Sequence, residues 1–150
     1  MIDIVKLSKY SKKIKLLYCE DNKEARESTL DFLQDFFDDI DVAIDGEDGY
    51  NKFVENSSKY DLIITDINMP KLTGIEMLDK IRDINTTIPA IIFSAYNEQD
   101  KIVNNLRLNV TGYLFKPIQL YQFVNLLFGV TQTFAINELK EEFNLMKKKH

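Results

Sequence analysis

The chain has 150 residues, of which 45% are hydrophobic and 29% charged, a composition ordinary for a single soluble globular domain. Its formal net charge of −5 gives no basic footprint for nucleic acid, so we expect no direct nucleic-acid contact by this segment. The single cysteine excludes an internal disulfide, and no apolar run approaches the roughly 20 residues that span a bilayer, so we expect a cytoplasmic location without membrane contact.

Strand-like and helix-like segments alternate along the chain. In chain order they are a strand at Ile14–Cys19, a helix from Lys23, a strand at Val42–Ile44, a helix at Glu47–Asn56, a strand at Tyr60–Ile67, a helix at Thr73–Ile84, a strand at Ile88–Phe93, a helix at Glu98–Leu108, a strand at Gly112–Phe115 and a helix after Gln119. Five strands alternating with helices predict an α/β protein with a parallel sheet covered on both faces.

Reactive side chains follow four of the predicted strands at their carboxyl ends. They are Glu20, Asp21, Asp66, Ser94 and Lys116. In open parallel sheets, ligands bind beyond the carboxyl ends of the strands. Each residue alone has an ordinary interpretation, as a helix cap, a turn residue or a solvated charge. Their common position at one sheet edge favours a functional site.

The residue types at this edge indicate phosphoryl chemistry. The carboxylates of Glu20, Asp21 and Asp66 would repel one another, and Mg²⁺, which takes oxygen ligands, relieves such repulsion. Lys116 supplies an ammonium for a phosphoryl oxygen, and Ser94 supplies a hydroxyl donor. Asp66 can then act as a nucleophile that forms an aspartyl-phosphate.

The ordered set of motifs resembles the receiver domain of two-component response regulators, including chemotaxis regulators. The matching pieces are LLYCEDN, LIITDINMP, IIFSA and GYLFKP, and the similarity runs from Lys15 to Gly129. The resemblance implies a flavodoxin-like, doubly wound five-stranded parallel sheet in the order 2-1-3-4-5. It also implies a non-enzymatic signalling switch rather than an enzyme.

The resemblance implies a role for each site residue. Asp66 would take a phosphoryl group from a phosphohistidine on a sensor histidine kinase or a phosphotransfer protein. Magnesium would be held by a set comprising Glu20, Asp21, Asp66 and the backbone carbonyl of Asn68. The only histidine in the chain, His150, is its last residue, which agrees with a donor on another protein.

Two further residues would contact the phosphoryl group and relay its presence. Ser94 and Lys116 would bind its oxygens, and the Lys116–Pro117 peptide bond would be cis. Movement of Ser94 would leave space that Tyr113 fills by a rotamer change. The remodelled surface would comprise the helix at Glu98–Leu108, the strand at Gly112–Phe115 and the helix after Gln119.

Both ends extend beyond what such a domain requires. We divide the chain into an N-terminal extension at 1–13, a receiver domain at 14–130 and a helical extension or linker at 131–150. The first segment is expected to be a frayed tail rather than a docking helix. The last carries a second apolar stripe, so we expect a homodimer, a connector to a missing output domain, or a helix folded back on the body. A homodimer through the remodelled surface described above is an alternative to one through this helix.

Two other functions remain open. One is a phosphatase that uses an aspartyl-phosphate, resembling the haloacid dehalogenase class, in which a second aspartate two residues after the nucleophile acts as general acid. The corresponding residue is Asn68, which cannot do acid–base work. The other is a receiver-like adaptor that no longer takes phosphate, which the intact Asp66, Ser94 and Lys116 argue against.

Overall fold

A computed structural model describes residues 2–95 and 108–149, and the helix expected at Glu98–Leu108 lies outside them except for its last residue. The elements are α1 (Ile4–Ser11), β1 (Lys15–Cys19), α2 (Lys23–Phe36), β2 (Asp39–Ala43), α3 (Gly46–Glu55), β3 (Leu62–Asp66), α4 (Gly74–Ile81), β4 (Ala90–Ser94), β5 (Gly112–Phe115) and α5 (Leu120–Lys148). Strands and helices alternate from β1 to β4, as the sequence predicts, and β5 is followed by α5.

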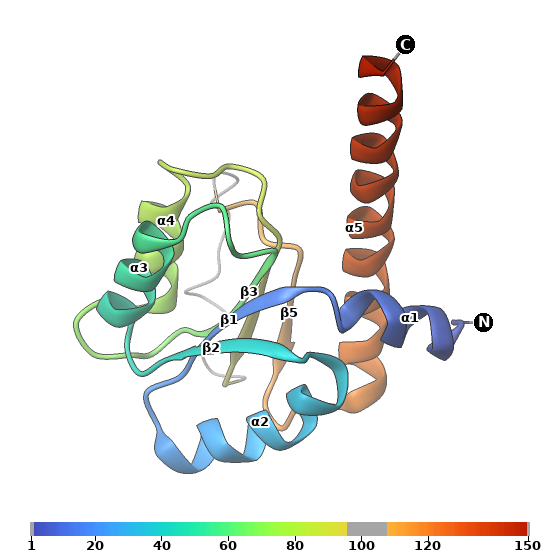
Figure 1. Cartoon of the computed structure of the whole chain (residues 1–150). Helices are drawn as coiled ribbons and strands as arrows, with labels where there is room; N and C mark the ends of the chain where they lie inside the picture. Colours follow the sequence, from blue (N-terminus) through green and yellow to red (C-terminus); the bar gives the residue numbers. More distant parts are fainter. Residues whose placement is uncertain (1, 96–107, 150) are drawn as a thin grey trace.

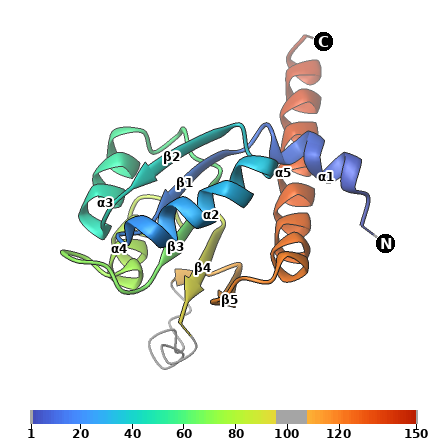
Figure 2. The same cartoon turned by 90° about the horizontal axis from the view of Figure 1, so that it is seen from below.

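The five strands form one sheet in the order β2-β1-β3-β4-β5, and every neighbouring pair is parallel (Figure 1). The flavodoxin-like fold expected from the sequence is confirmed. Since β1 lies between β2 and β3, the chain reverses its direction of travel across the sheet after β2. β5 is the edge strand beyond β4, and the turned view in Figure 2 shows the chain running from β5 into α5.

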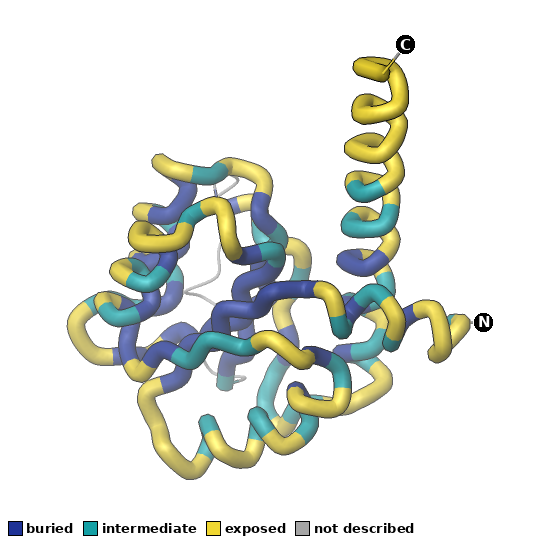
Figure 3. The backbone as a smooth tube through the Cα atoms, in the orientation of Figure 1, coloured by how far each residue is buried: buried dark blue, intermediate teal, exposed yellow. Residues whose placement is uncertain are grey.

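Alternate residues of the central strands build two separate cores. On β1, Leu17 and Cys19 face the core under α3 and α4, whereas Leu16 and Tyr18 face the core under α2 and α5. All residues of β1, β3 and β4 are buried, because helices cover both faces of the sheet (Figure 3). The unbroken apolar runs that identified these strands in the sequence have this cause.

The edge strand β2 begins three residues earlier than expected. The prediction placed it at Val42–Ile44, but it runs from Asp39 to Ala43, and Ile44 is exposed. The sequence misled because two of its strand residues are acids. Asp39 and Asp41 pair with the ammonium group of Lys15 on β1. These ion pairs allow the edge strand β2 to carry two acidic residues and still pair with β1.

The N-terminal segment forms a helix, so the expectation of a frayed tail is wrong. Asp3 caps α1 by accepting hydrogen bonds from the backbone N–H groups of Val5 and Lys6. Leu7 is 1% exposed and packs in the core shared with α5. The Nζ atom of Lys13, just beyond the helix, lies 3.7 Å from Oε2 of Glu138 on α5. The helix thus packs on α5 (Figure 2).

Helix α5 covers the sheet with its first half and projects from the body with its second half (Figure 1). Phe123, Leu127 and Val130 are buried against the sheet, whereas the apolar residues from Ile136 onward are exposed. The alternative of a folded-back helix is therefore wrong. Despite its length, α5 is not apolar enough to cross a bilayer, and the same holds for the other helices within the described residues.

The packing of α1 predicts a stability contribution from Leu7. Replacing Leu7 by Ala removes a buried side chain and should lower the free energy of unfolding by about 2–3 kcal/mol. Val5→Ala is the matched control, because Val5 is 80% exposed on the same helix. Urea unfolding of both variants measures the difference. Equal stability of the two variants would show that α1 does not stabilise the domain.

The free energy of unfolding should depend on pH through the carboxyl group of Asp41. Burial alone would raise the pKa of Asp41, but hydrogen bonds from Tyr60 and two lysines outweigh it and lower that pKa from 3.8 to about 2. A lowered pKa stabilises the fold above the unfolded value, and this contribution is lost as the pH falls toward the folded value. Asp41→Asn should therefore cost about 1 kcal/mol at pH 7, and the difference from wild type should shrink between pH 4 and pH 2. Urea titrations across this range, with Asp35→Asn as control, test it; a difference that stays constant with pH would contradict it.

Candidate functional site

The carboxyl ends of four strands bring the five reactive side chains predicted from the sequence to one edge of the sheet. Glu20 and Asp21 directly follow β1, Asp66 ends β3, Ser94 ends β4 and Lys116 follows β5. The register pairs Asp66 with Phe93 and Ser94 with Phe115, so neighbouring strands end at nearly the same level. Parallel pairing thus converts four distant sequence positions into one cluster.

Three carboxylates meet in this cluster. One oxygen from each of Glu20, Asp21 and Asp66 lies within 4.8 Å of the others. Glu20 is 1% exposed and Asp66 is 8% exposed, whereas Asp21 is open to solvent. Partial burial and the neighbouring Glu20 carboxylate raise the pKa of Asp21 above its usual value. The protonated form of Asp21 is thus favoured first by burial and then by the hydrogen bond with Glu20.

Lys116 is the cation of the cluster. Its Nζ lies 2.8 Å from Oε1 of Glu20 and 3.5 Å from Oδ1 of Asp66. Burial would lower the pKa of Lys116, but the hydrogen bond to Glu20 and the charge of Asp66 raise it above its usual value. Its backbone N–H donates to the carbonyl of Ser94, and the Lys116–Pro117 bond is cis, as expected. The ammonium is therefore charged and held beside Asp66.

Ser94 carries an unsatisfied hydroxyl. The residue is completely buried, and its Oγ is the one buried side-chain polar atom without a hydrogen-bond partner among the described residues. A buried polar group without a partner costs about 1–3 kcal/mol. Such an atom at the end of β4 is free to donate to an acceptor that arrives from outside the chain.

Local packing fixes the position of Asp66. The hydroxyl of Thr65 donates to the backbone carbonyl of Asp66 at 2.9 Å, and the N–H of Gly74 donates to the carbonyl of Ile67 at 2.8 Å. A Cβ on Gly74 would lie 2.0 Å from the carbonyl oxygen of Asp66. Only glycine therefore allows α4 to begin this close to the end of β3. Neither Thr65 nor Gly74 is predicted from the sequence to belong to the site.

Arg26 also supports the site and was missed. From the first turns of α2 its guanidinium donates to the backbone carbonyls of Glu20, at 2.9 Å, and of Asp21, at 3.2 Å. Both bonds fix the backbone of the acidic loop and leave the carboxylates facing the cluster. An arginine four residues after the predicted helix cap Asn22 was the only available signal in the sequence.

The donor set fits Mg²⁺. It consists of carboxylate oxygens, without nitrogen or sulfur ligands among the described residues that form the cluster. Hard divalent cations take such ligands, and magnesium typically uses one or two carboxylates and keeps several waters. Glu20, Asp21 and Asp66 would hold the ion. Asn68, whose carbonyl is the fourth expected ligand, lies two residues past Asp66 and is exposed, between the buried residues Ile67 and Met69.

Tyr113 lies outside this cluster, on β5. Its side chain is 51% exposed, and its ring packs edge-on against Phe115 with the centroids 5.6 Å apart. In the register of the sheet Tyr113 pairs with Ile92, two residues before Ser94. The aromatic ring is thus directed outward at the edge strand, one strand away from the buried hydroxyl.

The sequence matches the family described as Response regulator receiver domain over residues 16–128. It is 36% identical over 107 residues to the transcriptional regulatory protein CiaR of Streptococcus pneumoniae, covering 71% of this chain and 46% of CiaR. It is also 36% identical over 78 residues to the chemotaxis protein CheY of Treponema pallidum, covering 52% of this chain and 54% of that protein. The chain spans about half the length of these curated relatives.

The fold has solved counterparts as well. The N-terminal domain of an uncharacterized protein from Wolinella succinogenes superimposes with a TM-score of 0.74 at 33% identity. The match covers 83% of this chain and 98% of that domain. The family match over residues 16–128 includes the strand ends that carry the acidic cluster.

The acidic cluster predicts magnesium binding. Asp21→Asn removes one candidate ligand and should weaken Mg²⁺ binding by at least about tenfold. Asp35→Asn makes the same chemical change on the exposed face of α2 and should bind like wild type. Isothermal titration calorimetry with MgCl₂ measures both. Unchanged affinity in Asp21→Asn would remove this residue from the site.

Proposed function

The chain belongs to the response regulator receiver domain family, and from that premise we propose that Asp66 accepts a phosphoryl group from a phosphohistidine on a partner protein. The partner is a sensor histidine kinase or a phosphotransfer protein. The modified domain then acts as a switch in a two-component signalling pathway. It carries one phosphoryl group at a time and turns over no small substrate.

The transfer is a single in-line displacement. A carboxylate oxygen of Asp66 attacks the phosphorus, the P–N bond to the partner's imidazole breaks, and a P–O bond to Asp66 forms. Lys116 offsets charge on the transferring oxygens, and Ser94 can donate a hydrogen bond to one of them. Mg²⁺ held by the three carboxylates would add further charge neutralisation when bound.

One observation carries this proposal more than any other. The ammonium of Lys116 lies 3.5 Å from Oδ1 of Asp66, although the two residues are 50 positions apart in the sequence. The carboxylate can accept a phosphoryl group as nucleophile, and the cation and the unsatisfied buried hydroxyl can bind the oxygens of that group. Asp66 is 8% exposed, which leaves it in reach of a partner's side chain.

We propose that the switch runs from Ser94 to Tyr113. The buried hydroxyl of Ser94 gains an acceptor only when Asp66 is phosphorylated, which supplies the differential contact that any switch needs. Movement of Ser94 toward the phosphoryl group makes room for the ring of Tyr113, now half exposed, to turn inward. The surface that changes includes β5 and the first half of α5; its remaining part, the helix expected at Glu98–Leu108, lies outside the described residues.

The two competing functions have less support. For a phosphatase, Asn68 stands where the haloacid dehalogenase class needs a general acid, and an amide cannot donate and recover a proton. For an adaptor that takes no phosphate, the close set of Asp66, Lys116 and Ser94 would have no use. We therefore propose a phosphorylated switch without hydrolase activity.

We propose residues 14–130 as the receiver domain, flanked by extensions at 1–13 and 131–150. Transcriptional regulation, which the name of CiaR states, would come from an output domain joined to α5 or from a separate partner.

The membership in this family also supports a cytoplasmic location. The acidic net charge supports a role in which this segment itself does not touch nucleic acid.

Phosphorylation can be tested without knowledge of the kinase. Incubation with acetyl phosphate and Mg²⁺ should add the mass of one phosphoryl group, and neutral hydroxylamine should remove it, as it does from acyl phosphates. Asp66→Asn should gain no mass, whereas Asp35→Asn, the same change at an exposed acid of α2, should behave like wild type. Intact-protein mass spectrometry measures all three.

Two results would contradict the proposal. Wild type that gains no mass with Mg²⁺ present would support the adaptor. Continuous release of phosphate from p-nitrophenyl phosphate, lost in Asp66→Asn, would support the phosphatase.

A further inference from the structure

We propose that the projecting half of α5 binds the same segment of a second copy of this chain, as a parallel two-stranded coiled coil. The contact is made by four exposed apolar residues, which we call the outer stripe: Ile136, Leu139, Phe143 and Met146. Their spacing of three, four and three residues is the a-d-a-d pattern of a coiled coil. Ile at an a position followed by Leu at d favours two strands.

The outer stripe faces away from the body of the domain. Three residues of the stripe lie nine positions after a residue that packs toward the sheet. The pairs are Leu127 and Ile136, Val130 and Leu139, and Phe134 and Phe143. Nine residues are about two and a half helical turns, so the two sets lie on opposite sides of α5. Two copies that pair through the outer stripe would therefore place their sheets on opposite outer sides of the helix pair.

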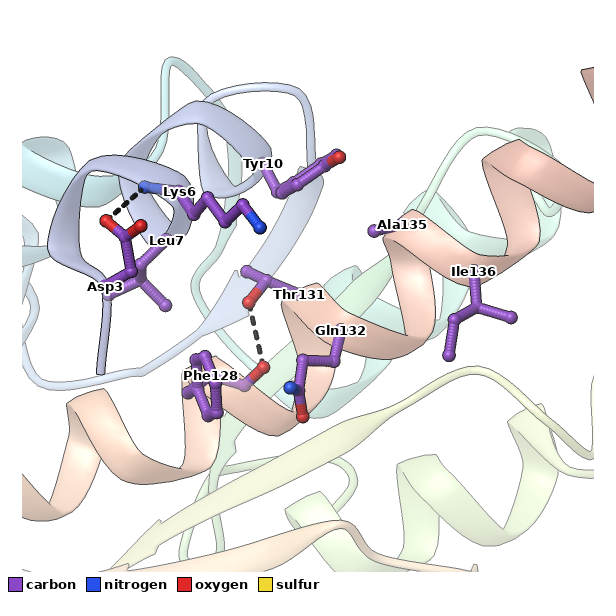
Figure 4. Close-up of a pocket in the computed structure, with 9 residues that line it drawn as sticks. All are labelled: Asp3, Lys6, Leu7, Tyr10, Phe128, Thr131, Gln132, Ala135 and Ile136. Carbon is purple, nitrogen blue, oxygen red and sulfur yellow. Dashed lines mark hydrogen bonds between the residues drawn. The ribbon is translucent and has the colours of Figure 1, made fainter. Parts of the chain in front are cut away.

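Helix α1 lies along a neighbouring side of α5 and approaches the outer stripe only at Ile136. A cleft of about 500 Å³ separates α1 from α5, lined by Leu7 and Tyr10 on one side and by Phe128, Ala135 and Ile136 on the other. Figure 4 shows Ala135 directed toward α1, whereas Ile136 points away from it. The outer stripe thus begins where the contact with α1 stops, and a second helix can lie along it.

Gly129 is an independent observation on the same side of the helix. It precedes Ile136 by seven residues, which is one a position earlier, and a Cβ there would meet nothing within 4 Å. Packing within the chain therefore does not require glycine, although glycine inside a helix costs about 1 kcal/mol relative to alanine. Close approach of a second helix gives this glycine a use.

The charges beside the outer stripe select the parallel orientation. In a parallel pair, the g residue Glu142 of one copy faces the e residue Lys147 of the other, five positions further along, and symmetry makes this ion pair twice. In an antiparallel pair centred on the stripe, Lys140 would face Lys140 and Glu142 would face Glu142. Within the described part of the chain Glu142 makes no ion pair, while Lys147 lies over the ring of Phe143 at the edge of the stripe.

Two leucines of α5 provide a matched test of the surface. Leu139 is 63% exposed on the outer stripe, and Leu145 is 59% exposed away from it. Sedimentation equilibrium of the full chain over a concentration series, without any phosphoryl donor, should show a monomer–dimer equilibrium. Leu139→Glu should weaken it at least about tenfold, and Leu145→Glu should leave it within about twofold of wild type.

The proposal is wrong if the wild-type chain stays monomeric throughout the series, or if the two substitutions weaken dimerisation equally. Because no phosphoryl donor is present, the result does not depend on whether Asp66 is phosphorylated. Both sites lie in the projecting half of α5, so circular dichroism should show that both variants keep the fold.

Charge exchange tests the orientation. Glu142→Lys and Lys147→Glu should each weaken the dimer, because each places like charges in contact across the parallel pair. The double variant Glu142→Lys with Lys147→Glu restores opposite charges and should return the dissociation constant to within about threefold of wild type. Failure of the double variant to recover would overturn the parallel register.

Discussion

The ion pair between Lys116 and the acidic cluster is the constraint on which the rest of the site depends. Glu20 is almost completely buried, and a buried carboxylate is tolerated only when it is paired. Lys116 pairs with it at 2.8 Å and in the same position approaches Asp66. Within the described residues, the fold thus holds three carboxylates beside the ammonium of Lys116 at the ends of buried strands. A cluster of this kind has a strong preference for a cation and keeps a lysine positioned for an incoming anion.

The same sheet connects this chemistry to the surface. Ser94 ends β4, and the neighbouring strand β5 carries Tyr113 and leads into α5. Helix α5 packs on the sheet with its first half and extends beyond the body with its second half. It therefore connects the sheet that carries Ser94 and Tyr113 with the outer stripe, where a second copy would bind. Since α1 packs on α5 through Leu7, it stabilises the position of α5 on the body of the domain.

The sequence was sufficient for the sheet and for the reactive residues because both are encoded locally. Continuous apolar runs such as Leu62–Ile64 specify buried strands, and parallel topology then places the residues after them at one edge. It was insufficient where the reason is a distant contact. Lys15 pairs with the acids of β2, and the burial of Leu7 against α5 holds α1 on the body of the domain. The supporting roles of Thr65, Gly74 and Arg26 likewise depend on their contacts with the backbone of Asp66 or of Glu20. The local sequence pattern does not predict these contacts.

The central claim is that Asp66, Ser94 and Lys116 bind one phosphoryl group together. A crystal structure of the chain with beryllofluoride and Mg²⁺ tests it most directly, because beryllofluoride mimics a phosphoryl group on a carboxylate. The account predicts beryllofluoride on a carboxylate oxygen of Asp66, with Oγ of Ser94 and Nζ of Lys116 each within hydrogen-bond distance of a fluorine. Beryllofluoride absent from Asp66, or bound there while Oγ of Ser94 stays unpaired and Nζ of Lys116 stays on Glu20, would contradict it.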